Sequence, residues 1–85
     1  MERVSVDKLC AVVEVALRTA SDKQELSAPV TREARMGEPA EWDSLSFVVV
    51  FNAIAEEFGI ELEDDDAIHF TAIETMHGFL EELAD

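Results

Sequence analysis

The helical spacing of the apolar residues limits most strongly the folds that this chain can adopt. In residues 4–20 apolar side chains recur at steps of three and four, as along one face of an amphipathic helix. This face consists of Val6, Leu9, Cys10, Val13, Ala16, Leu17 and Ala20. Ser5 precedes it at a position suited to an N-cap. We predict a first helix over 4–20, with Cys10 packed as a small hydrophobe and a reactive thiol as the alternative.

A second helical pattern, over residues 44–58, is apolar on two sides. Asp43 is placed to cap its start and Gly59 to end it. One side, which we expect to face the core, carries Phe47, Val50, Phe51, Ile54 and Phe58. The opposite side carries Leu45, Val48, Val49, Asn52 and Glu56. Because one small core cannot bury both sides, we expect the three aliphatic residues of the second to form an exposed docking patch, with ordinary surface exposure as the alternative.

The remaining segments complete a small bundle. Residues 21–43 lose the helical spacing and predict a long loop, with room for a helical turn over 32–36. Residues 60–62 suit a connector, and acids at 64–66 favour the start of a short helix ending near residue 70. The inner face of a last helix carries Ile73, Met76, His77, Leu80 and Leu83. We predict an all-α single domain over residues 1–85: a four-helix bundle of three longer helices and one short helix.

The charge of the chain is strongly asymmetric. The formal net charge is −14, all six Lys and Arg residues precede position 36, and fourteen of the twenty acids follow it. Such a field repels nucleic acid and attracts partners rich in Lys and Arg, although solubility alone would also explain it. No apolar run is long enough to span a membrane, and the first residues do not resemble a signal peptide. We expect a cytoplasmic monomer that does not insert into membranes.

Most familiar catalytic and metal-binding patterns are absent from the sequence. It has no glycine-rich phosphate loop, CxxC pair or HExxH motif. We expect His69 to face solvent and His77 to be a hydrogen-bonded residue at the core boundary. The acids of 61–66 lack the spacing of a calcium loop and are interpreted as solvated helix caps. We therefore predict no metal site and no catalytic residue.

Ser44 is the strongest candidate for chemistry. It follows the capping Asp43 at the first turn of the predicted second helix. Free N–H groups and the positive end of the helix dipole favour an anion such as a phosphate ester at this place. A serine near a helix start is also common in proteins without any modification. The position by itself leaves both interpretations open.

The surrounding sequence resembles the acyl carrier protein family. Residues 41–47, Glu-Trp-Asp-Ser-Leu-Ser-Phe, and the apolar helix that follows are similar to that family's Asp-Ser-Leu region and recognition helix. Residues 64–73 are similar to its acidic segment, short third helix and entry to the fourth. The family often has Gly where Trp42 stands, and its carriers for bulk fatty acid synthesis usually have acids at the positions of Ser46 and Val49. These differences favour a specialised polyketide, lipid or secondary-metabolite pathway.

The resemblance implies a carrier rather than an enzyme. A phosphopantetheinyl transferase would attach 4'-phosphopantetheine to Ser44, and the thiol of this arm would hold acyl intermediates as thioesters. Asp43 and Leu45 would flank the attachment site. Acyl-loading and acyl-transferring enzymes with basic docking surfaces would bind around it, and the residues expected to meet them are Glu41, Val48, Val49, Glu56 and Glu57.

Two other functions stay open at this point. One is an aminoacyl or peptidyl carrier. The acidic net charge and Asp43 argue against it. The other is an unmodified acidic helical protein that binds a basic partner. If the chain is an acyl carrier, we expect short or polar cargo, because Phe47, Phe51, Phe58 and Phe70 would crowd the space between the second and third helices.

Overall fold

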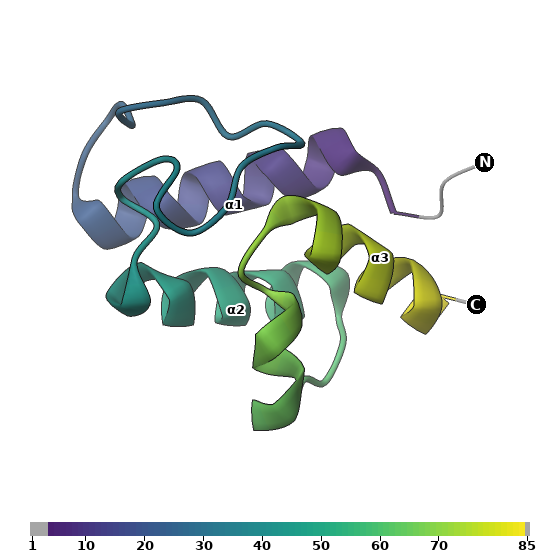
Figure 1. Ribbon diagram of the computed structural model, residues 1–85. Helices are drawn as coiled ribbons and strands as arrows, with labels where there is room; N and C mark the ends of the chain where they lie inside the picture. Colours follow the sequence, from purple (N-terminus) through teal and green to yellow (C-terminus); the bar gives the residue numbers. More distant parts are fainter. Residues whose placement is uncertain (1–3, 85) are drawn as a thin grey trace.

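A computed structural model describes residues 4–84, and each regular element in this range is helical. The elements are α1 (Val6–Ser21), α2 (Ser44–Phe58), the short 3₁₀ helix η1 (Asp64–His69) and α3 (Ile73–Ala84). α1 packs most extensively against α2, and α3 contacts both α1 and η1 (Figure 1). The predicted all-α bundle, with its long loop after the first helix, is confirmed. Within residues 4–84, no helix combines the length and apolar character needed to cross a membrane.

The start and the buried face of α1 follow from local sequence. The Lys8 backbone N–H donates to Ser5 Oγ at 3.3 Å, so Ser5 is the N-cap, as predicted. The buried residues of the helix are Leu9, Val13, Ala16 and Leu17. Cys10 packs against this core but stays half-buried, and burial raises the pKa of its thiol. Ala20 was expected on the same face but is exposed, because it lies in the last turn beside an open cavity of about 360 Å³.

The buried face of α2 is narrower than the apolar pattern suggested. Val50 and Ile54 are fully buried, whereas the three phenylalanines of the same side are half-buried at the edge of the core. The capping residues were predicted correctly: Asp43 begins the helix, and Gly59 ends it in a left-handed conformation with φ of 62°. The fully buried side chains around this helix include Leu9, Leu17, Trp42, Phe70, Ile73 and Met76.

α3 buries Ile73, Met76 and Leu80 but not Leu83. Leu83 was expected on the inner face and is half exposed, because it lies in the last turn of the helix. His77 is a boundary residue as predicted, and its Nε2 donates to the Val4 carbonyl oxygen at 2.8 Å.

His69 does not face solvent freely, which corrects its expected position. The residue is half-buried, and its ring stacks on the ring of Phe79 with 4.5 Å between centroids. The short helix η1 therefore contributes the His69 ring to the aromatic packing against α3. The sequence pattern missed this contact because Phe79 was not part of the apolar face predicted for the last helix.

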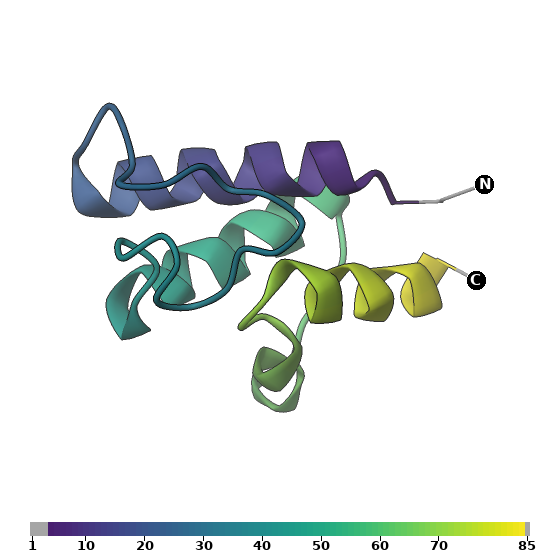
Figure 2. The same cartoon turned by 45° about the horizontal axis from the view of Figure 1, so that its top comes forward.

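The long loop runs back along α1 before it turns toward α2 (Figures 1 and 2). It contains a turn at residues 32–33 in place of the helical turn expected over 32–36. Its backbone instead pairs with the segment before α3: Met36 N donates to Thr71 O at 2.8 Å, and Ile73 N donates to Ala34 O at 3.0 Å. These bonds satisfy backbone groups that a helical turn would have paired locally.

Candidate functional site

Ser44 is the first residue of α2, and its side chain is exposed. The carboxylate of the preceding Asp43 accepts hydrogen bonds from the backbone N–H groups of Leu45 and Ser46, both at 3.0 Å. The bond from Ser46 N, and to a smaller extent the bond from Leu45 N, hold the pKa of Asp43 below its ordinary value, against the opposing effect of desolvation. Asp43 thus occupies N–H groups that the sequence argument had assigned to a phosphate ester. A group on Ser44 would feel the helix dipole but would project from the helix start into solvent.

Ser46 completes the cap from inside the protein. Its hydroxyl accepts from Asp43 N at 2.8 Å and donates to the Glu41 carbonyl oxygen at 2.7 Å. Asp43 and Ser46 therefore form a capping box, the reciprocal arrangement that fixes a helix start. Ser46 is buried and Ser44 is exposed, so only one of the two nearby hydroxyls is accessible to a modifying enzyme.

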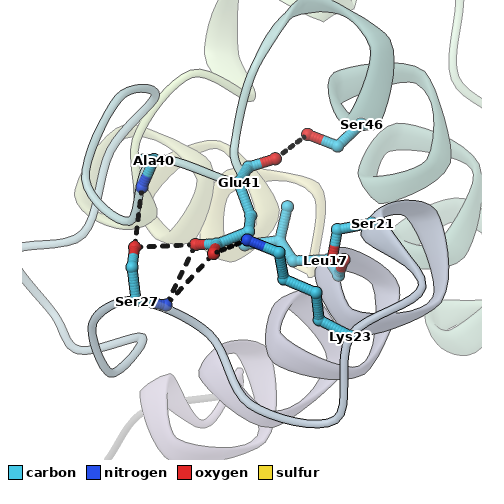
Figure 3. A network of polar contacts seen from close by, with 7 residues as sticks. All are labelled: Leu17, Ser21, Lys23, Ser27, Ala40, Glu41 and Ser46. Carbon is cyan, nitrogen blue, oxygen red and sulfur yellow. Dashed lines mark hydrogen bonds and ion pairs between the residues drawn. The ribbon is translucent and has the colours of Figure 1, made fainter.

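Glu41 was expected to grip a partner, and its position corrects this expectation. Its side chain is only 4% exposed and forms an ion pair with Lys23 Nζ at 3.0 Å. It also accepts from Ser27 Oγ at 2.8 Å and from Ser27 N at 3.1 and 3.2 Å (Figure 3). With these protein groups surrounding it, the carboxylate is unavailable to a basic partner. The sequence missed Lys23 and Ser27 because they lie 18 and 14 positions away, in a segment without periodicity.

The Glu41 contacts make a testable contribution to acid stability. The Lys23 bond, followed by the two Ser27 donors, lowers the pKa of Glu41 from 4.5 to about 2. Between these values the unfolded chain binds more protons at this site than the folded one, so the stabilisation is complete above pH 4.5 and is lost as the pH falls to about 2. Glu41→Gln should therefore destabilise the protein at pH 6, and its difference from wild type should shrink toward pH 2. Urea midpoints measured at intervals between pH 6 and pH 2.5 test this, and parallel pH profiles of the two proteins would contradict it.

Trp42 anchors the chain immediately before the site. Its side chain is fully buried, and in the described part of the chain its indole N–H has no hydrogen-bond acceptor. Its backbone closes a tight loop, because Gly37 N donates to Trp42 O at 2.9 Å and Trp42 N donates to Pro39 O at 3.0 Å. Trp42, which stands where the family that the sequence resembles often has Gly, therefore holds the loop that leads to Ser44 in place.

The second apolar side of α2 is exposed. Leu45 is 83% exposed, Val48 55% and Val49 36%. Val49 also lines a groove of about 540 Å³ between α1 and α2, to which α1 contributes Val15, itself 55% exposed. The sequence pattern assigned no role to Val15. It is an apolar residue outside the predicted buried face of the first helix, and this position could have identified it as part of an exposed apolar surface. The exposed aliphatic surface thus extends from α2 onto α1.

Two expected partner-binding acids border this groove. Glu56 and Glu57 both line it and both are exposed. Glu57 pairs with Lys8 Nζ at 3.6 Å, and the same ammonium group lies 5.3 Å from the centre of the Phe58 ring. An exposed pair of this kind contributes little to stability, so it can be exchanged for a partner's charge at small cost.

A row of aromatic rings occupies the other side of α2. The ring centroids of Phe47 and Phe51 are 6.1 Å apart, those of Phe51 and Phe70 5.1 Å, and those of Phe70 and Phe79 5.7 Å. Three of the four phenylalanines expected between the second and third helices are in this row, together with Phe79. Phe58 lies at the other end of α2, under Lys8. The ring pairs of the row are stacked or edge to face, at centroid distances typical of packed aromatic side chains.

Comparison with known proteins gives one informative relative. Over 79 residues, 93% of this chain, the sequence is 35% identical to the protein named "Acyl carrier protein 2, chloroplastic" of Arabidopsis thaliana. The chain spans about half of that relative's length, 54%. No family model and no solved structure matches the chain. The relative's name is that of a carrier and not of an enzyme, as predicted for this chain. Together with the all-helical fold, this similarity to an acyl carrier protein supports the family resemblance that the sequence shows.

Proposed function

We propose that this protein carries acyl intermediates as thioesters on a 4'-phosphopantetheine arm joined to Ser44. The observation that carries the proposal is the exposed Ser44 hydroxyl at a capped helix start, inside an Asp-Ser-Leu sequence shared with the family it resembles. In the loading step Ser44 Oγ loses its proton and bonds to the phosphorus that bears the pantetheine of coenzyme A, and the bond to the departing nucleotide phosphate breaks. When attached, the arm supplies a thiol that forms the thioester. The chain's own residues hold Ser44 outward and keep the neighbouring hydroxyl of Ser46 out of reach.

Intact-mass spectrometry tests the proposal directly. The purified protein is incubated with coenzyme A and a broad-specificity phosphopantetheinyl transferase, and its mass should rise by one phosphopantetheine group. Peptide mapping should place the group on Ser44. Absence of an adduct with several transferases that load a control carrier would favour the alternative of an unmodified acidic protein. Subsequent loading with amino acids rather than acyl groups would favour a peptidyl carrier.

The partner surface that we propose consists of Leu45, Val48 and Val49, with Glu56 and Glu57 beside it. It supports binding to enzymes whose docking surfaces combine basic and apolar residues, because the acids attract the partner and the aliphatic side chains bury area on contact. We propose a specialised pathway on the ground that Ser46 and Val49 replace acids usual in bulk fatty acid carriers. A cytoplasmic location and a monomeric state stay predictions, since the relative's name places that protein in the chloroplast.

Substitutions on this surface should distinguish the electrostatic attraction of a partner from the apolar contact with it. Val49→Glu should weaken binding of the transferase roughly 10-fold, equal to about 1.4 kcal/mol, mainly through faster dissociation. Glu56→Gln should chiefly slow association and reduce its dependence on salt. Surface plasmon resonance at two salt concentrations measures both rates, with Glu82→Gln on α3 as an exposed-acid control. Unchanged kinetics for Val49→Glu, with a normal circular dichroism spectrum, would remove Val49 from the surface.

The aromatic row supports a preference for short or polar cargo. Phe51 and Phe70 already contact each other edge to face, so a long chain can enter only if packed rings separate. Loading an acetyl group should leave the NMR signals of Phe51, Phe70 and Phe79 unchanged, and a long saturated chain should change them no more than acetyl does. Large shifts of these rings with the long chain alone would show that the row opens and that the cargo preference is wrong.

A further inference from the structure

Glu41 connects the long loop to the start of α2 through two different parts of the same residue. Its carboxylate holds Lys23 Nζ and both donors of Ser27, and Ser27 Oγ also accepts from Ala40 N at 3.4 Å. The segment 23–27 is therefore fastened to residues 40–41 by both side chains and backbone, as Figure 3 shows. A surface loop of this length would otherwise be expected to move independently of the helix that follows it.

The backbone of Glu41 continues the connection into the helix. Its carbonyl oxygen accepts from Ser46 Oγ at 2.7 Å, and that hydroxyl in turn accepts from Asp43 N at 2.8 Å. Ser44 lies between Asp43 and Ser46, and both of these neighbours are held by the chain of bonds that begins at the Glu41 carboxylate. Trp42 lies between Glu41 and Asp43 in the sequence, and its fully buried side chain anchors this segment in the core.

We propose that Glu41 is a positioning residue for the loading of Ser44. It holds the first turn of α2 in one orientation against the loop, so that the exposed hydroxyl meets the transferase preorganised. The inference rests on the proposed function of Ser44 and adds a residue that touches neither the arm nor the partner. Misplacement of a reacting group by about 1 Å can cost on the order of 100-fold in rate, so a loosened first turn should affect the chemical step strongly.

The steady-state kinetics of loading should show this role mainly as a change in kcat. Leu45 and Val49 of the proposed docking surface line the same cavity as Glu41 and Lys23, but the Glu41 side chain itself is buried and is not part of the exposed surface. Binding of the carrier, and with it KM, should therefore change much less than kcat. We expect kcat to fall at least tenfold in Glu41→Ala and less in Glu41→Gln, whose amide oxygen can still accept from Ser27. Ser27→Ala should have a smaller effect again, because the Ser27 backbone N–H remains.

Val13→Ala is the control for loss of stability alone. Val13 is fully buried in α1 and makes no hydrogen bond to the network through its side chain, so this variant should be destabilised while its kcat stays at the wild-type value well below its melting temperature. Amide hydrogen exchange supplies a readout that does not depend on loading. The Leu45 and Ser46 amides should exchange faster in Glu41→Gln than in wild type, and their exchange in Val13→Ala should show no such local increase.

The possible results separate the inference from the proposed function. If wild type is not loaded at all, the proposed function fails, and the exchange data alone decide whether Glu41 orders the helix start. If wild type is loaded and the Glu41 variants have normal kcat, or show a rise in KM only, the positioning role is wrong. An equal fall of kcat in Val13→Ala would also overturn it. Should Glu41→Ala fail to fold, Glu41→Gln and Ser27→Ala still distinguish these outcomes.

Discussion

Ser44→Ala is expected to abolish loading completely and to leave the free energy of unfolding within about 0.5 kcal/mol of wild type. The Ser44 side chain is exposed and has no hydrogen bond within residues 4–84, and alanine suits a first helical turn. Intact mass after prolonged incubation with transferase and coenzyme A should show the unmodified protein alone. Urea unfolding followed by circular dichroism should match wild type.

Ser46→Ala is the matched control, two positions away in the same turn. Its hydroxyl is buried and pairs with Asp43 N and the Glu41 carbonyl oxygen, so removing it should cost about 1–3 kcal/mol. This variant should still be loaded to completion, although more slowly if the helix start is loosened. Ser44→Ala should therefore abolish the mass increase and leave stability unchanged, whereas Ser46→Ala should keep the mass increase and lose stability. A Ser44→Ala protein that gains the group, or a folded Ser46→Ala protein that never does, would show that the attachment site is assigned to the wrong hydroxyl.

Trp42→Ala is expected to have the largest effect on stability, a loss of about 3–5 kcal/mol. The indole is the largest fully buried side chain in the described part of the chain, and its removal leaves a cavity beside the start of α2. Small domains are stable by only about 5–15 kcal/mol, so the variant should unfold at much lower urea concentration or lose its fold near room temperature. Circular dichroism is the suitable signal, because the substitution removes the chain's only tryptophan.

Leu45→Ala tests whether size alone explains such a loss. Leu45 is also apolar and lies three residues further on, but it is almost fully exposed, so its truncation should change stability by less than about 0.5 kcal/mol. Comparable losses in the two variants would mean that Leu45 is packed in solution and does not belong to an open docking surface. A small loss for Trp42→Ala would mean that the loop before Ser44 can repack around the missing ring.

Much of the helical framework could be predicted from the sequence because it depends on local rules. Burial of one helix face produces the spacing of Leu9, Val13 and Leu17, and caps such as Ser5 and Asp43 bond to backbone groups two or three residues away. The exposed position of Val48 and Val49 also follows locally, since one helix cannot bury both of its sides in a small core. The exposure of Ala20 and Leu83 does not, because the periodic pattern says nothing about where neighbouring elements stop covering a helix.

Only the tertiary structure decided which of the two acids near Ser44 is buried in a network and which stays exposed. Asp43 and Glu41 are both acids just before the first turn of α2, and the family resemblance implied that Asp43 flanks the attachment site and that Glu41 meets partners. Folding returns the loop so that Lys23 and Ser27 surround Glu41, while Asp43 stays at the exposed helix start. The sequence by itself determined the helices, their caps and the candidate hydroxyl, because these depend on contacts within a few residues. The buried carboxylate and the row of rings depended on closing a long loop and docking two helices, since their partners are distant in the chain and only the completed packing brings them together.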